Sequence, residues 1–174
     1  ILWISVAGPD LIPKYSWKGI TIRCRFIILN MGPEYRMTTA QKLDAFRTTL
    51  SDEENLLFEF QFKVLQYLRP YLQNQLRLEE ELGKLLYVKD ENNRTFDYDL
   101  AANNLLMDTL RARNFKGEVF SEETKWTKFG TSREIIITDP ICNSSLLRRG
   151  FRNVASGVTF FRGKEFVAGA LTDF

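Results

Sequence analysis

The sequence of 174 residues contains no histidine. Ser-His-Asp and Cys-His mechanisms need an imidazole that takes up and returns a proton, so both are excluded. The zinc sites built on histidine are excluded for the same reason. Any catalysis must therefore rest on carboxylates, hydroxyls, backbone groups and a hard metal ion.

Cysteine is scarce as well, because the chain has only Cys24 and Cys142, which form no CxxC pair and no disulfide framework. We therefore expect a reduced, cytoplasmic setting. No run of about 18 apolar residues is present, so we predict no transmembrane helix and no membrane partner. The formal net charge of +2 gives no indication of binding to nucleic acid.

The first 36 residues differ from the rest, since they hold three of the five prolines and one strand-like run from Ile20 to Leu29. Met37 followed by two threonines would be a natural start, with a threonine capping the next helix. We therefore divide the chain into an N-terminal extension, residues 1–36, which need not be native, and a domain, residues 37–174.

Helical signals fill the first part of that domain. Ser51 and Glu54 form a capping-box pattern, and the helix behind it should end or kink at Pro70. A second helical stretch is predicted from Leu72 to Leu86, followed by a polar loop over residues 89–97. A third helix is predicted from about Asp99 to Arg113, because apolar residues recur there at helical spacing.

After Gly117 the pattern changes to strands, which are predicted over residues 118–121, 134–138, 154–161 and 165–171. Gly163 lies between the last two and suits a hairpin turn. Helices followed by strands indicate an α+β domain, in which N-terminal helices lie on a largely antiparallel sheet.

Carboxylates recur where these elements begin or end: Asp99 at a helix start, Glu122-Glu123 after one strand and Asp139 after another. Such oxygen ligands suit Mg²⁺. The polar run from Asn143 to Ser145 could open a helix whose free N–H groups suit a phosphate. Taken singly, each segment also has a simpler interpretation: a solvated strand edge, a turn, or a carboxylate that stabilises a helix dipole.

Together the segments resemble the inositol monophosphatase family of magnesium-dependent, lithium-sensitive carbohydrate phosphatases. The family pattern is an Asp at a helix start, then Gly and Glu-Glu-Ser/Thr, then Asp-Pro-Ile/Leu-Asp-Gly-Thr/Ser. This chain has Asp99, Gly117, Glu122-Glu123-Thr124 and then Asp-Pro-Ile-Cys-Asn-Ser over residues 139–144. The resemblance is clear from Asp99 to Asp173 and implies the first domain of that fold.

The resemblance also implies roles for individual residues. Glu122, Asp139 and the carbonyl of Ile141 would hold Mg²⁺, and Asp99 with the hydroxyl of Ser144 would orient the attacking water. Backbone N–H groups of Asn143, Ser144 and Ser145 would hold the phosphate of a small phosphorylated sugar or polyol. Arg148 and Arg149 are further candidates for phosphate contact, although a solvated basic cluster with Arg152 is the simpler interpretation.

The chain departs from the family pattern at Cys142, which replaces an Asp that helps hold a second metal ion, and at Asn143, which replaces a glycine. Thiols prefer softer metals than Mg²⁺. The sequence also stops before the family's C-terminal domain. Two hypotheses therefore stand: a metal-dependent phosphate monoesterase, and a catalytically inactive binding or assembly module. In either case we expect a homo-oligomer or a partner chain, because half of the layered fold is missing.

Overall fold

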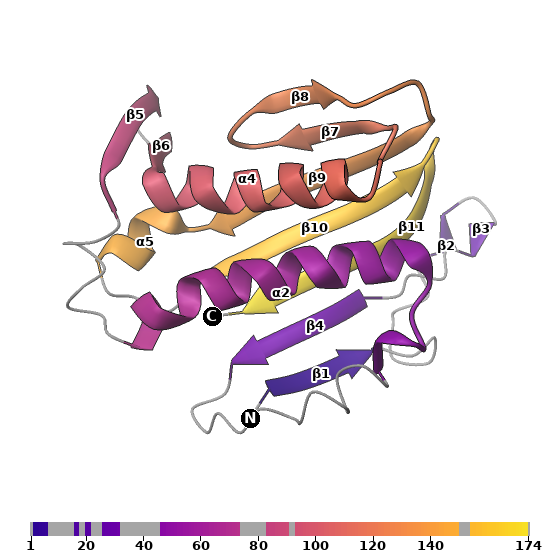
Figure 1. Cartoon of the computed structure of the whole chain (residues 1–174), viewed down its shortest axis with the longest axis horizontal. Coiled ribbons are helices and arrows are strands. Elements are labelled where there is room, and N and C mark those ends of the chain that lie inside the picture. Colours follow the sequence, from indigo (N-terminus) through magenta and orange to yellow (C-terminus); the bar gives the residue numbers. More distant parts are fainter. Residues whose placement is uncertain are drawn as a thin grey trace.

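The computed structural model describes residues 2–6, 16–17, 20–21, 26–31, 46–73, 83–90, 93–149 and 154–173. Two long helices lie against one face of a seven-stranded sheet (Figure 1). The helices are α2 (Asp52–Gln73), α4 (Asp97–Ala112) and the short α5 (Ser144–Arg148). The strands of the large sheet are β1 (Leu2–Val6), β4 (Phe26–Met31), β7 (Glu118–Ser121), β8 (Lys125–Lys128), β9 (Glu134–Cys142), β10 (Ala155–Arg162) and β11 (Glu165–Asp173).

The order of strands in the sheet is β1-β4-β11-β10-β9-β7-β8. Four neighbouring pairs are antiparallel, and two pairs, β4 with β11 and β7 with β9, are parallel. The predicted α+β class with a largely antiparallel sheet is therefore confirmed. Strands β1 and β4, which come from residues 1–36, extend the same sheet beyond β11, and the division of the chain at residue 36 stays a prediction. Of the helix expected after Met37, the structure describes only residues 46–47, which are helical.

Helix α2 begins with the predicted capping box. The Ser51 N–H donates to Glu54 Oε2 at 2.8 Å, and the Glu54 N–H donates to Ser51 Oγ at 3.2 Å. Of the two outcomes predicted at Pro70, an end or a kink, the first is wrong, because the helix continues to Gln73. A proline near the end of a helix removes few intrahelical hydrogen bonds, so the last turn can still form.

The predicted second helix is wrong where the structure describes it. Residues Leu85–Asp90 form strand β5, which pairs with β6 (Asn93–Phe96) inside the expected polar loop. A separate small pair is formed by β2 (Ser16–Trp17) and β3 (Ile20–Thr21). Gly83 has φ of 94°, a left-handed conformation that stops a helix, and the Tyr87-Val88 pair favours extended backbone. Tertiary pairing thus outweighs the leucine spacing.

The hydrophobic core lies between the two long helices and the sheet. Fully buried side chains include Phe60 and Leu68 from α2, Leu106 from α4, and Ile136 and Phe160 from the sheet. Contacts of α2 with β10 and β11, and of α4 with β9, fix both helices on one face. This packing holds the first turn of α4 near the end of β9, which is where the acidic residues gather.

The C-terminal strands agree closely with prediction, and Gly163 adopts φ of 65° in the β10–β11 turn. Two features were not predicted. Strand β8 pairs with β7, and β9 does not end at Thr138 but continues to Cys142.

Candidate functional site

The parallel pairing of β7 with β9 brings the first two acidic segments together. Ser121 lies opposite Thr138, and the Glu122 N–H donates to the Thr138 carbonyl at 3.3 Å. The next residues along the two strands are Glu122 and Asp139. Because parallel neighbours lie about 5 Å apart, these two carboxylates occupy adjacent positions at one end of the sheet.

A bulge in β9 then places Cys142 beside Asp139. Asp139 pairs with Gly157 and Cys142 pairs with Ala155, so three steps along β9 match two steps along β10. In a regular strand, the side chains of residues three positions apart point to opposite faces of the sheet. The extra residue of the bulge shifts this alternation by one, so Asp139 and Cys142 point to the same face. The Cys142 thiol accordingly donates a hydrogen bond to the Asp139 carboxyl. Pro140, which has no N–H to donate, lies within the bulge.

Asp99 approaches from the first turn of α4 and is only 2% exposed. Its Oδ2 accepts a hydrogen bond from the Phe96 N–H at 2.7 Å, which holds the carboxyl at the helix start. Its Oδ1 is buried and has no hydrogen-bond partner among the described residues. The simpler interpretation, a carboxylate that caps a helix, therefore accounts for one oxygen and leaves the other unexplained.

Glu123 belongs to the same cluster, although no role of its own was predicted for it. Thr95 in β6 donates to Glu123 Oε2 at 2.7 Å, and the Tyr87 hydroxyl in β5 donates to the Glu123 carbonyl at 3.4 Å. The β5–β6 hairpin thus lies against the acidic residues. Thr95 lies just before the helix that contains Asp99, and this position was the signal in the sequence that could have pointed to the contact. It was overlooked because residues 89–97 were predicted to form a loop.

The polar run after β9 does open a helix, the five-residue α5. Asn143 precedes it with φ of 62°, a left-handed conformation that suits glycine and that asparagine tolerates better than most residues. The Tyr98 hydroxyl donates to the Ser144 carbonyl at 2.6 Å and so ties α5 to α4. Ser144 is half-buried and close enough to Asp99 for a side-chain hydrogen bond that lowers the Asp99 pKa.

The remaining predicted residues are less closely tied to the cluster. Ile141 is buried within the bulge, and Ser145 is exposed on α5. Arg149 is exposed just after α5, and no described contact joins it to the carboxylates. The side chain of Arg148 and all of Arg152 lie outside the described residues.

The electrostatics of the site follow from gathering carboxylates in a poorly solvated place. Burial, with the neighbouring charge of Glu123, raises the pKa of Asp99 to about 8. Burial and the Glu122 carboxylate raise the pKa of Asp139 to about 6. Burial raises the pKa of the Cys142 thiol, and the negative charge of Asp139 is the next largest cause of the rise. A cation placed among these groups would lower the pKa of each, because positive charge stabilises a carboxylate or a thiolate.

The donor atoms fit a divalent cation only in part. Carboxylates and the unpartnered Oδ1 of Asp99 are the hard oxygen ligands that Mg²⁺ prefers, whereas the Cys142 sulfur is a soft ligand. In the part of the chain that the structure describes, no three acidic or cysteine side chains converge closely enough to hold a metal ion as they stand. A bound cation would have to draw them together by side-chain rotation.

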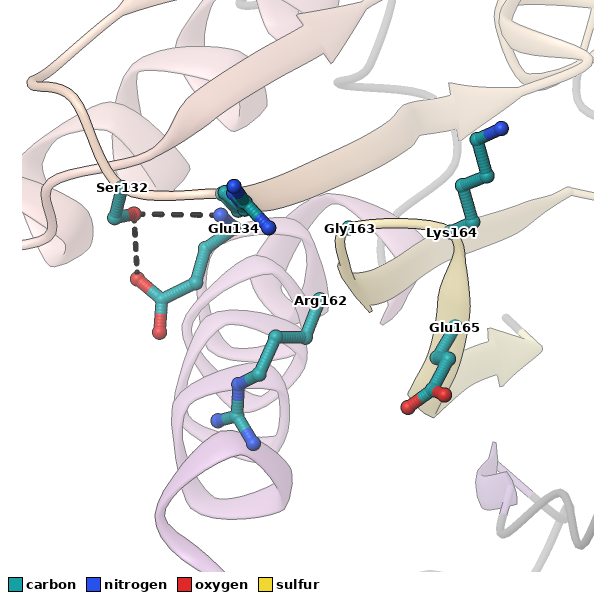
Figure 2. A pocket seen from close by; sticks show the side chains of 7 residues that line it. Ser132, Glu134, Arg162, Gly163, Lys164 and Glu165 are labelled. Atoms are coloured by element: carbon teal, nitrogen blue, oxygen red, sulfur yellow. Dashed lines mark hydrogen bonds between the residues drawn. The ribbon is translucent and has the colours of Figure 1, made fainter.

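A separate surface depression lies at the opposite end of the sheet, at the turns before β9 and between β10 and β11 (Figure 2). Charges of both signs line it, and several are already bonded: Arg162 pairs with Glu53, and Ser132 donates to Glu134 at 3.0 Å. We assign it no chemistry. Among the described residues, no helix is long and apolar enough to cross a membrane.

Comparison of the sequence with protein-family models and with curated proteins finds no match. Comparison of the structure does find relatives. The extragenic suppressor protein SuhB from Bartonella henselae superposes with a TM-score of 0.61 at 18% identity, over 71% of this chain and 45% of that one. A protein described as an inositol monophosphatase–fructose 1,6-bisphosphatase superposes with a TM-score of 0.60 at 16% identity, over 72% of this chain and 46% of that one.

A third solved structure is an inositol monophosphatase/NADP phosphatase complexed with Mg²⁺ and phosphate, with a TM-score of 0.50 at 12% identity, over 78% of this chain and 45% of that one. The chain therefore spans under half the length of these relatives. At such low identities the likeness concerns architecture and not activity. The resemblance indicated by the acidic motifs is confirmed at that level: over about 70% of its length, this chain has the inositol monophosphatase fold.

Proposed function

We propose that this chain carries the metal-binding half of a magnesium-dependent phosphatase site that hydrolyses the phosphate monoester of a small sugar or polyol. The observation that carries the proposal is the meeting of Asp99, Glu122, Glu123 and Asp139 at one end of the sheet. Carboxylates repel one another, and a protein gains no stability from crowding them unless a cation balances their charge. The shared fold with a phosphatase crystallised with Mg²⁺ and phosphate supports the same assignment.

The proposed metal ligands are Glu122, Asp139 and the carbonyl of Ile141. When bound, Mg²⁺ would lower the pKa of a coordinated water and neutralise charge on the phosphoryl group. Asp99 and the Ser144 hydroxyl, which lie close to each other, would orient the attacking water and accept its proton. No covalent intermediate on the protein is required.

The proposed phosphate contacts are the backbone N–H groups of Asn143, Ser144 and Ser145. The bond from the Tyr98 hydroxyl to the Ser144 carbonyl would keep this segment in place against α4. Arg148 is the last residue of this short helix and Arg149 follows it, and both are proposed to add positive charge toward the phosphate. The sugar or polyol portion of the substrate has no assigned contact in this chain.

The test is phosphate release from a panel of inositol and sugar phosphates, with Mg²⁺ or Mn²⁺ titrated. We expect metal-dependent turnover that Glu122→Gln abolishes. A matched control is Glu165→Gln, an exposed carboxylate at the far end of the sheet, which should leave turnover unchanged. Absence of turnover from a folded wild-type chain would reject the enzymatic proposal for this chain.

A second candidate function is that of a catalytically inactive binding or assembly module. Two observations favour it: the thiol of Cys142 lies among the carboxylates, and the sheet exposes large apolar side chains, with Trp126 at 59%, Ile137 at 42% and Leu171 at 40%. Such side chains commonly mark a surface that contacts another protein chain. Under this alternative the protein self-associates or binds a partner chain, and a monomer by light scattering at micromolar concentration would count against it.

A further inference from the structure

The outer face of the sheet, on the side away from the helices, carries an apolar row. Along β9, Ile136 packs in the core, so the alternation of the strand turns Ile135 and Ile137 to the outer face. Phe120 of β7 pairs with Ile137 and also with Trp126 of β8, and the two ring centroids lie 5.3 Å apart. These side chains form one row across the strands, in which Trp126 and Ile137 are exposed.

The row continues over β10 and β11 with small residues. Thr159 pairs with Ile137 on one side and with Gly169 on the other. One step toward the acidic end, Leu171 is exposed beside Gly157, where an added Cβ would meet only the Leu171 side chain, at 4.0 Å. The outer face is therefore broad and open, and five neighbouring strands contribute to it.

Charges of opposite sign lie at the two ends of this face. At one end, Glu122, Asp139 and Asp173 continue the outward positions of β7, β9 and β11. At the other end, Arg133 directly precedes β9 and Lys164 lies in the β10–β11 turn. Both cationic side chains are exposed, and neither forms an ion pair within the part of the chain that the structure describes.

The other charges at the basic end do not cancel these two on the outer face. Arg162 forms an ion pair with α2, and Glu165 pairs with Arg162 across the hairpin, so both belong to the helix side. Figure 2 shows Lys164 pointing away from these two side chains. Lys128 and Glu118 lie on the outer face but neutralise each other, with 3.6 Å between their charged atoms.

A face that is acidic at one end and basic at the other is complementary to a copy of itself turned end for end. A two-fold axis along the apolar row gives this arrangement, because each acidic end then meets a basic end and the row meets itself. An axis along the strands would instead bring the two acidic ends together. We propose that the outer face binds a second copy of this chain about a two-fold axis along the row of Trp126 and Ile137, forming a sandwich of two sheets.

The face is large enough for such a contact. Five strands cover about 24 Å, and the nine residues of β9 or β11 span about 30 Å. Because β7 and β8 have only four residues each, the footprint is roughly 600 Å² per copy, or about 1,200 Å² in total, the lower limit of a standard specific interface.

The free edge of β8 is a less suitable contact between copies. Two β8 strands that pair about a two-fold axis would place Lys125 of one copy opposite Lys128 of the other. Like charges directly opposite each other destabilise a strand pair. Charge therefore favours packing through the face over pairing through the edge.

The inference rests on the second candidate function, because it names the partner of the exposed apolar surface. Its first test is sedimentation equilibrium of the full chain at micromolar concentrations. We expect a dimer that dissociates more readily as salt is added, since the two ends attract by charge. Ile137→Glu would place two like charges on the axis and should raise the dissociation constant by on the order of 100-fold. Leu86→Glu is the matched control, because Leu86 is 40% exposed against 42% for Ile137 but lies in β5, outside the face.

The orientation of the two copies is tested by disulfide formation after Cys24→Ser and Cys142→Ser have removed the native thiols. Thr159 lies in the row and so faces itself across the proposed axis, and Thr159→Cys should form a disulfide between copies on mild oxidation. Ile135 lies off the row and faces the acidic end of the second copy, so Ile135→Cys should not. An axis along the strands would reverse these two results, and this test does not depend on Ile137→Glu folding.

Several outcomes would overturn the inference: a monomeric wild type, a dimer lost in Leu86→Glu, or a disulfide formed by Ile135→Cys and not by Thr159→Cys. A dimer that Ile137→Glu leaves intact would reject this face while leaving self-association standing. Metal-dependent turnover by a monomeric chain would leave the phosphatase proposal standing and reject the dimer.

Discussion

Replacing Asp99 with asparagine removes a buried carboxyl whose pKa is raised to about 8 and so changes how stability depends on pH. A carboxyl with a raised pKa in the folded state binds its proton more tightly there than in the unfolded chain. Stability is therefore highest when the group is protonated in both states, and it falls as pH rises from about 4 to about 8. Asparagine keeps an oxygen that can accept the Phe96 N–H and carries no proton to lose.

The magnitude follows from the two pKa values. With an unfolded value near 3.8 and a folded value of about 8, the carboxyl lowers the free energy of unfolding by about 3.5 kcal/mol between pH 5 and pH 8. Domains of this size are stable by about 5–15 kcal/mol, so the loss is large enough to measure. The free energy of unfolding of Asp99→Asn, taken relative to that of wild type, should therefore rise by about 3.5 kcal/mol between pH 5 and pH 8.

The assay is urea unfolding of both proteins at pH 5, 6, 7 and 8 without divalent cations. Asp108→Asn is the matched control: Asp108 lies on the same helix, is well exposed and pairs with Arg111, so its curve should run parallel to that of wild type. If the difference between wild type and Asp99→Asn stays constant across this pH range, Asp99 is not the buried proton-binding group described above.

The remaining predictions concern the scaffold of the site and can be measured by thermal or urea unfolding. Gly117→Ala should destabilise the protein strongly, by about 3 kcal/mol, because an added Cβ would lie 2.2 Å from the Glu134 carbonyl oxygen; a loss under about 1 kcal/mol would contradict this packing. Gly163→Ala meets no neighbour and should cost only about 1 kcal/mol for its left-handed conformation. Ser51→Ala removes the α2 cap and should cost about 1 kcal/mol, whereas no loss would show that the capping box contributes nothing.

Local signals predicted much of the fold. The capping box at Ser51, the apolar stripe of α4 and the turn at Gly163 each act within a few residues, and each was found where the sequence placed it. The leucines near Leu86 show the opposite case. Their spacing indicated a helix, but pairing with residues 93–96 makes them a strand, and such pairing is invisible to a local pattern.

The candidate site was predictable as a set of residues but not as a geometry. Order and spacing identified Asp99, Glu122 and Asp139, and the structure brings these segments to one end of the sheet. The bulge that turns Cys142 toward Asp139 depends on the register with β10, which the sequence does not reveal. The contact of Thr95 with Glu123 was missed for the same reason, because it joins two elements far apart in the chain.

Titration calorimetry is the clearest test of whether the carboxylates at this end of the sheet form a divalent-cation site. Mg²⁺ should be added to the metal-free chain in the presence of inorganic phosphate, beside Asp139→Asn and the far-end control Glu165→Gln. We expect saturable binding by wild type and by Glu165→Gln, and at least a tenfold weaker affinity in Asp139→Asn, a loss of about 1.4 kcal/mol in binding free energy. Equal binding by all three proteins, or no binding by a folded wild type, would contradict the account.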